Sequence, residues 1–491
     1  MRHPVVVTVL CLCSLVPIVA ALSVEHRLLG DDPLITLTYA KNISVGNGFV
    51  FNQGDPVLGT TTPLFALVVG LLMAVLPVPG TAIAVWLSAL CWVGLIWSLY
   101  VCRDAFRIPA GLAAWIGATI TASGWVAHLG MEAYPFALLL VATLGAVYGG
   151  RPLLAGVLGG LLFLTRGEGI LLFGLAAAAG TWIWWRDDRE DSTSLLRMPP
   201  FLMAAGFLIP LGLWSLYAMP TFGNIFPNTL AAKIAQVDSG LWPAFQTRLI
   251  GDWVPGWKIG PSLGPALFNV FFLLAIAGLV RAAREHPRLL ILPVWGLAYG
   301  AGYALLGVPG YPWYRLPIEF VLIVLVGIGL GGLAALCGAD HTQAWRRRAA
   351  FVPGAVAIVV LALGGSLEDI RRPPVHDKDR AYLKMAEWFD THGTEGERIA
   401  YMEIGYLGYY TDLGIVDLVG LVTPEITSRV AARDFTSGFW ELEPEYLVSL
   451  ERSRFILPIL DNPEFAPRYE RVAELDGFDG LGLSVFRRYP D

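Results

Sequence analysis

Long apolar segments alternate with short polar connections through the first 365 residues of the chain. A helix that crosses the hydrocarbon core of a membrane needs ~20 apolar residues, with a range of ~17–25. The pattern therefore predicts a polytopic α-helical membrane protein with about 11 spans. The predicted spans are residues 4–22, 81–101, 109–127, 133–149, 152–165, 168–185, 199–218, 264–281, 289–306, 316–336 and 350–365.

Basic residues occupy every second connection between these segments. Because lysine and arginine accumulate in cytoplasmic loops, this distribution predicts the topology. With Arg2 inside, the N-terminus is cytoplasmic and the C-terminus lies outside the plasma membrane. The outer face then presents the loops 23–80, 128–132, 219–262 and 307–315. The basic clusters are Arg103/Arg107, Arg151, Arg186/Arg189/Arg197, Arg281/Arg284/Arg288 and Arg346/Arg347/Arg348.

The apolar segment at residues 63–77 is not counted as a span. It has only fifteen residues and is bounded by Pro63 and Pro77. If it crossed the membrane, the later basic clusters, except the Arg151 loop, would face the wrong side. Thr62 and Pro63 suit the N-cap and the first position of a helix. We therefore expect a helix that lies at the outer interface or re-enters it.

The first apolar segment has a second interpretation. Residues 1–23 have a short basic start, an apolar run and small residues at the end, which is also the form of a cleaved signal peptide. Residue 30 lies outside the membrane under either interpretation.

Composition divides the chain near residue 366. Overall, 55% of the residues are hydrophobic and 15% are charged, against roughly 25% charged in soluble proteins. Residues 366–491 hold 24 acidic and 14 basic residues, whereas the first 365 hold 16 and 20. The C-terminal 126 residues are long enough for one soluble extracytoplasmic domain. Their acidic balance disfavours a nucleic-acid partner.

The C-terminal segment has a mixed α/β pattern. An amphipathic helix is expected at 378–391 and strands at 397–403, 415–419, 454–460 and 483–489. Such a domain can grip a glycan acceptor or simply cover a cavity, and the sequence leaves both roles open. The five cysteines of the chain all lie in or beside apolar segments and show neither a disulfide framework nor a zinc spacing.

Two adjacent carboxylates, Asp31 and Asp32, follow the first apolar segment. Asp32 and Pro33 suit the N-cap and first position of a helix that ends before Gly46. Asp31 then lies one residue outside the helix, near the positive end of its dipole. An ionised carboxylate there can act as a general base or bind a divalent cation, so a cation at this pair is left open. The plain alternatives are a helix cap for Asp32 and a solvated loop acid for Asp31.

Further polar residues fall on the same predicted outer face. His128 and Glu132 precede the fourth span, where Glu132 can also serve as a helix cap. Arg166 and Glu168 lie between two spans, where they can simply pair with each other. We place Glu132 and His128 among the candidate substrate-binding residues.

The last two outer loops add two cations and an amide. Asn228 begins a predicted helix that carries Lys233, and Arg315 precedes a span. Lys233, Arg315 and Arg166 suit an anionic phosphate group, and Asn228 joins the substrate-binding candidates. The plain alternative for Arg315 is that its side chain reaches toward lipid headgroups.

Several of these motifs resemble those of a known superfamily. GDDPLITLTYAKNISVGNGFVFNQGDPVLGTTTPLF, residues 30–65, resembles the first outer loop of GT-C glycosyltransferases, and most closely that of the bacterial terminal arabinofuranosyltransferase group. HLGMEAYPFALLL, LTRGEG, FPNTLAAK, WYRLP and GYYTDLGIVDLVGLVTPE look like that group's later motifs, in the same order. Gly167 departs from the pattern, where Pro is expected.

The resemblance implies a GT-C transmembrane domain at residues 1–365 with a catalytic first loop, and an extracytoplasmic domain at 366–491. It implies an inverting transfer of one sugar from a polyprenyl-phosphate donor to a glycan, lipid or protein acceptor. Asp31 would be the general base, with Asp32 beside it. Lys233, Arg315 and Arg166 would hold the donor phosphate.

Two other functions remain open at this point. A lipid flippase or transporter should show inverted repeats and broken helices near mid-membrane, and the sequence shows neither. A catalytically inactive relative that only binds lipid carriers would not need the Asp pair, which is intact.

Overall fold

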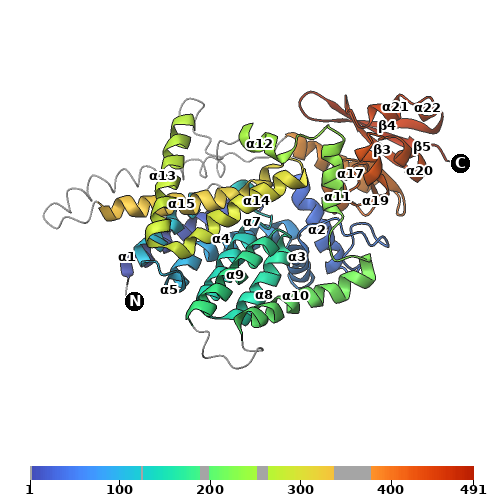
Figure 1. Ribbon diagram of the computed structural model, residues 1–491. Helices are drawn as coiled ribbons and strands as arrows, with labels where there is room; N and C mark the ends of the chain where they lie inside the picture. The colour runs from blue at the N-terminus through green and yellow to red at the C-terminus, as the bar shows by residue number, and fades with distance from the viewer. Residues whose placement is uncertain (1–2, 123–124, 188–197, 252–263, 337–376, 491) are drawn as a thin grey trace.

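The computed structural model describes residues 3–122, 125–187, 198–251, 264–336 and 377–490. Figure 1 shows a long helical bundle with the C-terminal domain at one end, beside α2 and α11. Five described helices are long and apolar enough to cross a membrane, and the chain is an integral membrane protein. The last predicted span, 350–365, and the Arg346–Arg348 cluster lie outside the described residues.

The other predicted spans correspond to helices within a few residues at each end. The helices of the bundle are α1 (Pro4–Val24), α4 (Gly80–Val101), α6 (Ala110–Thr121), α7 (Ala133–Tyr148), α8 (Pro152–Thr165), α9 (Gly169–Asp187), α10 (Pro199–Phe222), α13 (Gly264–Glu285), α14 (Ile291–Leu306) and α15 (Leu316–Leu336). Short helices join them: α5 (Arg103–Phe106), η1 (Trp125–His128), α11 (Thr229–Asp238), α12 (Phe245–Gly251), η4 (Pro287–Leu290) and η5 (Pro312–Tyr314).

The first predicted outer loop folds into two helices. α2 (Asp31–Ser44) ends just before Gly46, whose φ of +87° a residue with a side chain rarely adopts. α3 (Pro63–Val75) has 13 residues and is one of the shorter apolar helices, as are α6 and α8. It packs against α2 so closely that a Cβ on Gly70 would lie 2.9 Å from the carbonyl oxygen of Ala40.

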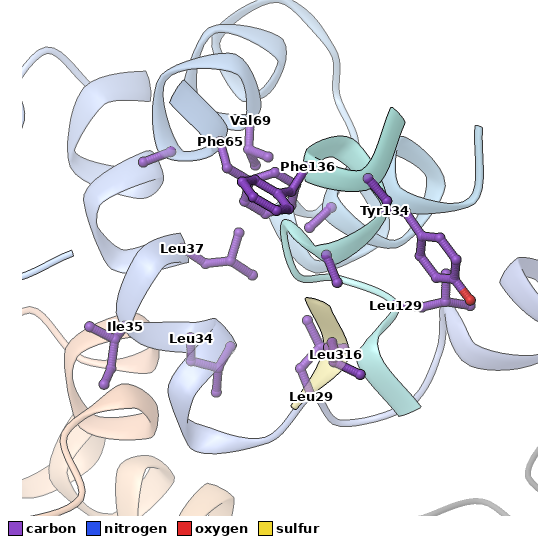
Figure 2. Packing of buried hydrophobic residues seen from close by; sticks show 14 of the residues in the cluster. Leu29, Leu34, Ile35, Leu37, Phe65, Val69, Leu129, Tyr134, Phe136 and Leu316 are labelled. Carbon is purple, nitrogen blue, oxygen red and sulfur yellow. The ribbon is translucent and has the colours of Figure 1, made fainter. Parts of the chain in front are cut away.

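Apolar packing fixes the start of α2 in the bundle. Leu34 and Leu37 of α2 are fully buried, and Phe65 and Val69 of α3 lie in the same cluster as Phe136 of α7. Figure 2 shows these side chains converging from three elements. The polar residues that precede and follow Leu34 are thereby held in defined directions.

The C-terminal domain is a five-stranded mixed sheet with helices on it. The strand order is β2-β1-β3-β5-β4, with β1 parallel to β2 and β3, and the remaining pairs antiparallel. The strands are β1 (Arg398–Tyr401), β2 (Gly414–Asp417), β3 (Tyr446–Leu450), β4 (Tyr469–Asp476) and β5 (Gly482–Arg488). The helices are α17 (Asp377–His392), α18 (Gly405–Tyr410), α19 (Pro424–Ala431), α20 (Ser437–Leu442), α21 (Leu457–Leu460) and α22 (Phe465–Arg468).

One predicted strand is wrong. Residues 454–460 contain a turn and the short helix α21, in which Pro458 occupies the second position. Proline fixes a helical φ and has no N–H to give to a ladder, so it favours a helix start over a strand. The strands β3 and β4 were not predicted, while the predicted α17, β1, β2 and β5 are present.

Candidate active site

The carboxylate pair lies inside α2 rather than at its cap. Gly30 is the N-cap residue, in an extended conformation, and Asp31 and Asp32 are the first two helical residues. The prediction that Asp32 caps the helix is therefore wrong. Pro33 is tolerated at the third position because the first backbone N–H groups of a helix have no partner within it.

Asp31 is buried against the C-terminal domain. Only 8% of it is exposed, and its Oδ1 accepts a hydrogen bond of 3.1 Å from the backbone N–H of Tyr406. Burial, followed by the charges of Glu403 and Asp32, holds the pKa of Asp31 well above its usual range. The alternative of a solvated loop acid is wrong.

Asp32 lines a polar pocket of about 530 Å³, part of it open to solvent. Helix geometry turns each residue by ~100° from the last, so the two carboxylates point in different directions. The pocket lies between α2, α11, the start of α7 and the C-terminal domain. Its lining residues are Asp32, Ile35, Thr36, Gly59, Thr60, Thr61, Thr62, Met131, Glu132, Arg166, Thr229, Lys233, Trp313, Tyr314 and Leu421.

Lys233 supplies a cation to this pocket. It is 8% exposed, and its ammonium lies 4.1 Å from the ring centroid of Tyr311. Among the residues that the structure describes, this ammonium has no hydrogen-bond or ion-pair partner. Burial lowers the pKa of Lys233, and the charge of Asp32 works against that shift.

Asp32 is the complementary group in the same pocket. Its carboxylate also has no hydrogen bond or ion pair within the described parts of the chain. Burial raises the pKa of Asp32, and the charge of Lys233 is the largest influence that opposes this rise. The pocket thus offers one anionic and one cationic group, each open to a ligand.

Arg166 has two carboxylate partners. Its Nη1 donates to Glu132 at 3.0 Å and its Nη2 to Glu168 at 2.9 Å, and Glu168 also accepts from the Tyr303 hydroxyl. The predicted Arg166–Glu168 pairing is confirmed. Glu132 is the N-cap residue of α7 but makes no side-chain cap bond, so its predicted capping role is wrong. Two acids therefore offset the charge of Arg166, whereas the Lys233 ammonium has no such partner among the described residues.

Besides Asp31, three predicted site residues are absent from the described pocket lining: His128, Asn228 and Arg315. Arg315 follows η5 and, with burial, helps lower the pKa of His128 to about 4. Asn228 donates instead to the carbonyl oxygens of Gly420 and Leu421, at 2.8 and 3.1 Å. Asn228 thereby ties the start of α11 to the C-terminal domain.

A threonine cluster was not predicted. The hydroxyl oxygens of Thr36 and Thr60 lie 3.0 Å apart, and those of Thr60 and Thr62 lie 3.2 Å apart. Thr62 precedes α3 as expected, but its side chain joins this cluster rather than capping the helix. The run of three threonines before Pro63 was the available signal, since hydroxyl groups suit hydrogen bonding to a sugar.

An apolar groove lies beside the pocket. It encloses about 1,010 Å³, part of it open, between the end of α2 and helices α3, α8 and α10. Thr62 lines the pocket while Leu64 lines the groove, and Arg166 lines the pocket while Leu164 lines the groove. The two spaces therefore share the same two chain segments as walls. Within the described residues, no group of three or more His, Cys, Asp or Glu side chains is placed to hold a metal ion.

Solved structures share this arrangement of helices and C-terminal domain. ArnT from Cupriavidus metallidurans, in the apo state and bound to undecaprenyl phosphate, superposes with TM-scores of 0.59 and 0.57 at 18% identity, over 99% of this chain and 98% of ArnT. The fold is that of the GT-C glycosyltransferases. An oligosaccharyltransferase from Archaeoglobus fulgidus, tethered with an acceptor peptide, also matches (TM-score 0.53, 13% identity, 91% of this chain and 69% of that one).

The GT-C fold confirms the predicted fold class, a membrane helical bundle with a small C-terminal α/β domain. Residues 369–489 match a family described as a domain of unknown function, DUF8728. No curated protein matches the sequence.

Proposed function

We propose that the protein is an inverting glycosyltransferase that moves one sugar from a polyprenyl-phosphate donor to a glycan, lipid or protein acceptor. The observation that carries the proposal is the pocket in which Asp32 and the buried Lys233 both lack a hydrogen-bond or ion-pair partner among the residues that the structure describes. The GT-C fold supports it, because the solved ArnT binds undecaprenyl phosphate and the solved oligosaccharyltransferase carries an acceptor peptide.

The chemistry needs one base and one cation. A carboxylate takes the proton of the acceptor hydroxyl, and the acceptor oxygen forms a bond to the anomeric carbon. The bond from that carbon to the phosphate oxygen breaks, and the lipid phosphate leaves with the electron pair. Lys233 stabilises the charge that grows on the phosphate. Attack from the face opposite the leaving group inverts the anomeric carbon, as in inverting glycoside hydrolysis.

We assign the base to Asp32. The sequence alone favoured Asp31, but Asp32 is the member of the pair that lines the pocket with Lys233. Burial raises the pKa of Asp32, which makes its carboxylate a better proton acceptor near neutral pH. Glu132 and the threonine cluster are placed to contact the sugar or the acceptor. A divalent cation, if one takes part, would be held by the Asp32 carboxylate and would supply charge stabilisation to the leaving phosphate.

The apolar groove is the proposed site of the donor's hydrocarbon chain. Its lining includes Leu64, Leu164, Trp214 and Pro210, and burying a polyprenyl chain there removes apolar surface from water and lipid headgroups. We place the reaction at the outer face of the plasma membrane, with the N-terminus in the cytoplasm and the C-terminal domain outside, as the basic clusters predict. Arabinofuranose, suggested by the motif resemblance, is the first sugar to test.

A donor panel tests the function. The purified full chain is incubated with decaprenyl- and undecaprenyl-phosphate derivatives of several pentoses and hexoses, and release of lipid phosphate is measured with and without candidate acceptors. We expect turnover of one sugar class. A flippase would bind a donor and move it across a liposome membrane without cleaving it, and that result would replace the transferase proposal.

Two variants then decide the base. Asp32→Asn should lower transfer by about 10²–10⁴-fold while binding of undecaprenyl phosphate is retained. The same change at the neighbouring residue, Asp31→Asn, should lower transfer less, because the Asp31 side chain faces the C-terminal domain. If Asp31→Asn is inactive and Asp32→Asn transfers sugar normally, then Asp31 is the base.

A further inference from the structure

The C-terminal domain reaches the carboxylate pair directly. The backbone N–H of Tyr406 donates to Oδ1 of Asp31 at 3.1 Å, and the Tyr406 hydroxyl donates to the carbonyl oxygen of Leu29. The residues on both sides of the α2 N-terminus are thus held by one residue of α18. α18 packs against α2: Gly405 lies against Asp31, and the carbonyl oxygen of Tyr409 accepts a hydrogen bond from Lys41.

Gly405 makes this approach possible. A Cβ at this position would lie 2.0 Å from the backbone carbonyl oxygen of Asp31 and 3.0 Å from its carboxyl carbon. Real Cβ atoms do not come that close to backbone, so any side chain here would push α18 away from α2. The hydrogen bond from Tyr406 to Asp31 depends on that close contact.

The same domain also brings two charges to the pair. Lys378 of α17 and Glu403, between β1 and α18, form an ion pair of 2.7 Å and are both partly buried. Glu403 raises the pKa of Asp31 and of Asp32, after burial, whereas Lys378 lowers the pKa of Asp32. The charges of Asp31 and Asp32 in turn help raise the pKa of Lys378.

We propose that the C-terminal domain is a working part of the catalytic centre: its contact with Asp31 through Gly405 and Tyr406 brings the Lys378–Glu403 ion pair close enough to tune the charge of the Asp31–Asp32 pair, so that Lys378 and Glu403 act as positioning residues. Gly405 and Tyr406 dock the domain onto that pair. The inference rests on the proposed function and gives a role to the region that matches a domain of unknown function. This role differs from that of a cover over the cavity or of an acceptor-binding domain, because the domain donates a hydrogen bond to the carboxylate of Asp31 itself.

Charged and titratable groups face the pair from every element packed on it. Among the described residues they are Tyr382 and Lys378 of α17, Tyr401 of β1, Glu403 and Tyr406 beside or in α18, Lys233 of α11, Tyr311 and Tyr314 at η5, and Glu132 before α7. Of the groups in the C-terminal domain, Glu403 raises the pKa of Asp32 and Lys378 lowers it, and a single substitution can remove either charge.

The test compares Glu403→Gln with Lys378→Met in the full chain. Removing Glu403 relieves repulsion on the carboxylates, so the acidic limb of kcat/KM should move to lower pH, by about 1 unit. Removing Lys378 takes away a cation, so the limb should move to higher pH by a similar amount. If the two residues were purely structural, the variants would lose activity while the acidic limb of the kcat/KM profile stayed at the same pH. An unchanged acidic limb in both variants would overturn the proposal.

A docking variant gives a second readout. Gly405→Ala should lower kcat at least tenfold while the affinity for undecaprenyl phosphate changes little, because Lys233 is not displaced. Gly482→Ala is the matched control, since its Cβ would meet only the flexible end of Glu474, at 3.8 Å. Normal kcat for Gly405→Ala, or an equal loss in Gly482→Ala, would refute the docking role.

Separate measurements distinguish failure of the transferase function from failure of the positioning role of Lys378 and Glu403. If the native chain turns over no donor, the transferase function fails. Infrared difference spectra of the protonated carboxyl band, assigned with Asp31→Asn, still follow the titration of the pair without turnover. If Glu403→Gln and Lys378→Met leave that titration unchanged, the positioning role fails as well, and if they shift it in opposite directions the positioning role stands.

Discussion

The buried environment of Lys233 favours an anionic ligand. A buried ammonium without a partner costs free energy, which a bound anion would recover. Its contact with the Tyr311 ring offsets part of that cost. The pocket also contains Asp32, and the anion must therefore approach Lys233 from the side away from that carboxylate. A phosphate with a sugar between it and Asp32 satisfies both groups.

Lys233→Ala should weaken binding of undecaprenyl phosphate by about 10- to 100-fold, since a hydrogen bond to a charged group contributes roughly 1.5–3 kcal/mol. Tryptophan fluorescence titration in detergent measures the change. Lys384→Ala is the control, because that side chain is 60% exposed and pairs with Asp476. Unchanged affinity in Lys233→Ala would remove it from the phosphate site.

Asp31 and Asp32 show which features of the candidate site could be predicted from the sequence and which could not. The GDDP motif was enough to place a helix start nearby and to single out a carboxylate that lines the candidate pocket. It was not enough to decide which carboxylate faces the pocket, because neighbouring residues of a helix point ~100° apart. The helix begins two residues earlier than predicted, with Gly30 rather than Asp32 as its N-cap, so both carboxylates lie within it. The partner of Asp31 lies 375 positions away in the chain.

At the scale of elements, glycine sets the distance between helices α8 and α10. A Cβ on Gly156 would lie 2.1 Å from the carbonyl oxygen of Met203, and one on Gly206 would lie 2.2 Å from that of Leu153. Small residues allow this close packing in membranes. These two helices form walls of the apolar groove, so their separation fixes its width.

Gly156→Ala should therefore destabilise the protein despite the better helix propensity of alanine. Overpacking costs ~1–3 kcal/mol, against a gain of at most ~1 kcal/mol from propensity. Gly212→Ala on α10 is the matched control, because nothing lies within 4 Å of its Cβ. Thermal unfolding in detergent should show a lower midpoint for Gly156→Ala only. Equal midpoints would mean that the helices separate freely.

Elements were predicted well where a single physical pattern determines them. Long apolar runs identified the bundle helices, and amphipathic spacing identified α17. β3 is a short, almost fully buried apolar run, which periodicity cannot distinguish from a buried helix segment. β4 is an edge strand with mostly exposed residues, so no buried face marked it in the sequence.

At the scale of the whole molecule, the first loop covers an open edge of the C-terminal sheet. β2 is an edge strand. The side chain of Asn52 donates to the carbonyl oxygen of Ile415 at 2.9 Å and accepts from its N–H at 2.8 Å. An amide thus takes the place of a neighbouring strand, which satisfies groups that would otherwise be available for aggregation. Together with Asn228 and Asp31, it joins the domain to the bundle from three segments.

Asn52→Ala should loosen this junction. Two backbone groups of Ile415 would lose their partner, at a cost of about 1–3 kcal/mol. Hydrogen exchange should rise in β2 and limited proteolysis should cut more readily between the bundle and the C-terminal domain. Gln53→Ala, at the exposed adjacent position, should change neither. If the C-terminal domain positions the carboxylates, Asn52→Ala should also lower kcat more than it lowers the affinity for undecaprenyl phosphate. A loosened junction with full kcat would mean that the bundle holds the Asp31–Asp32 pair by itself.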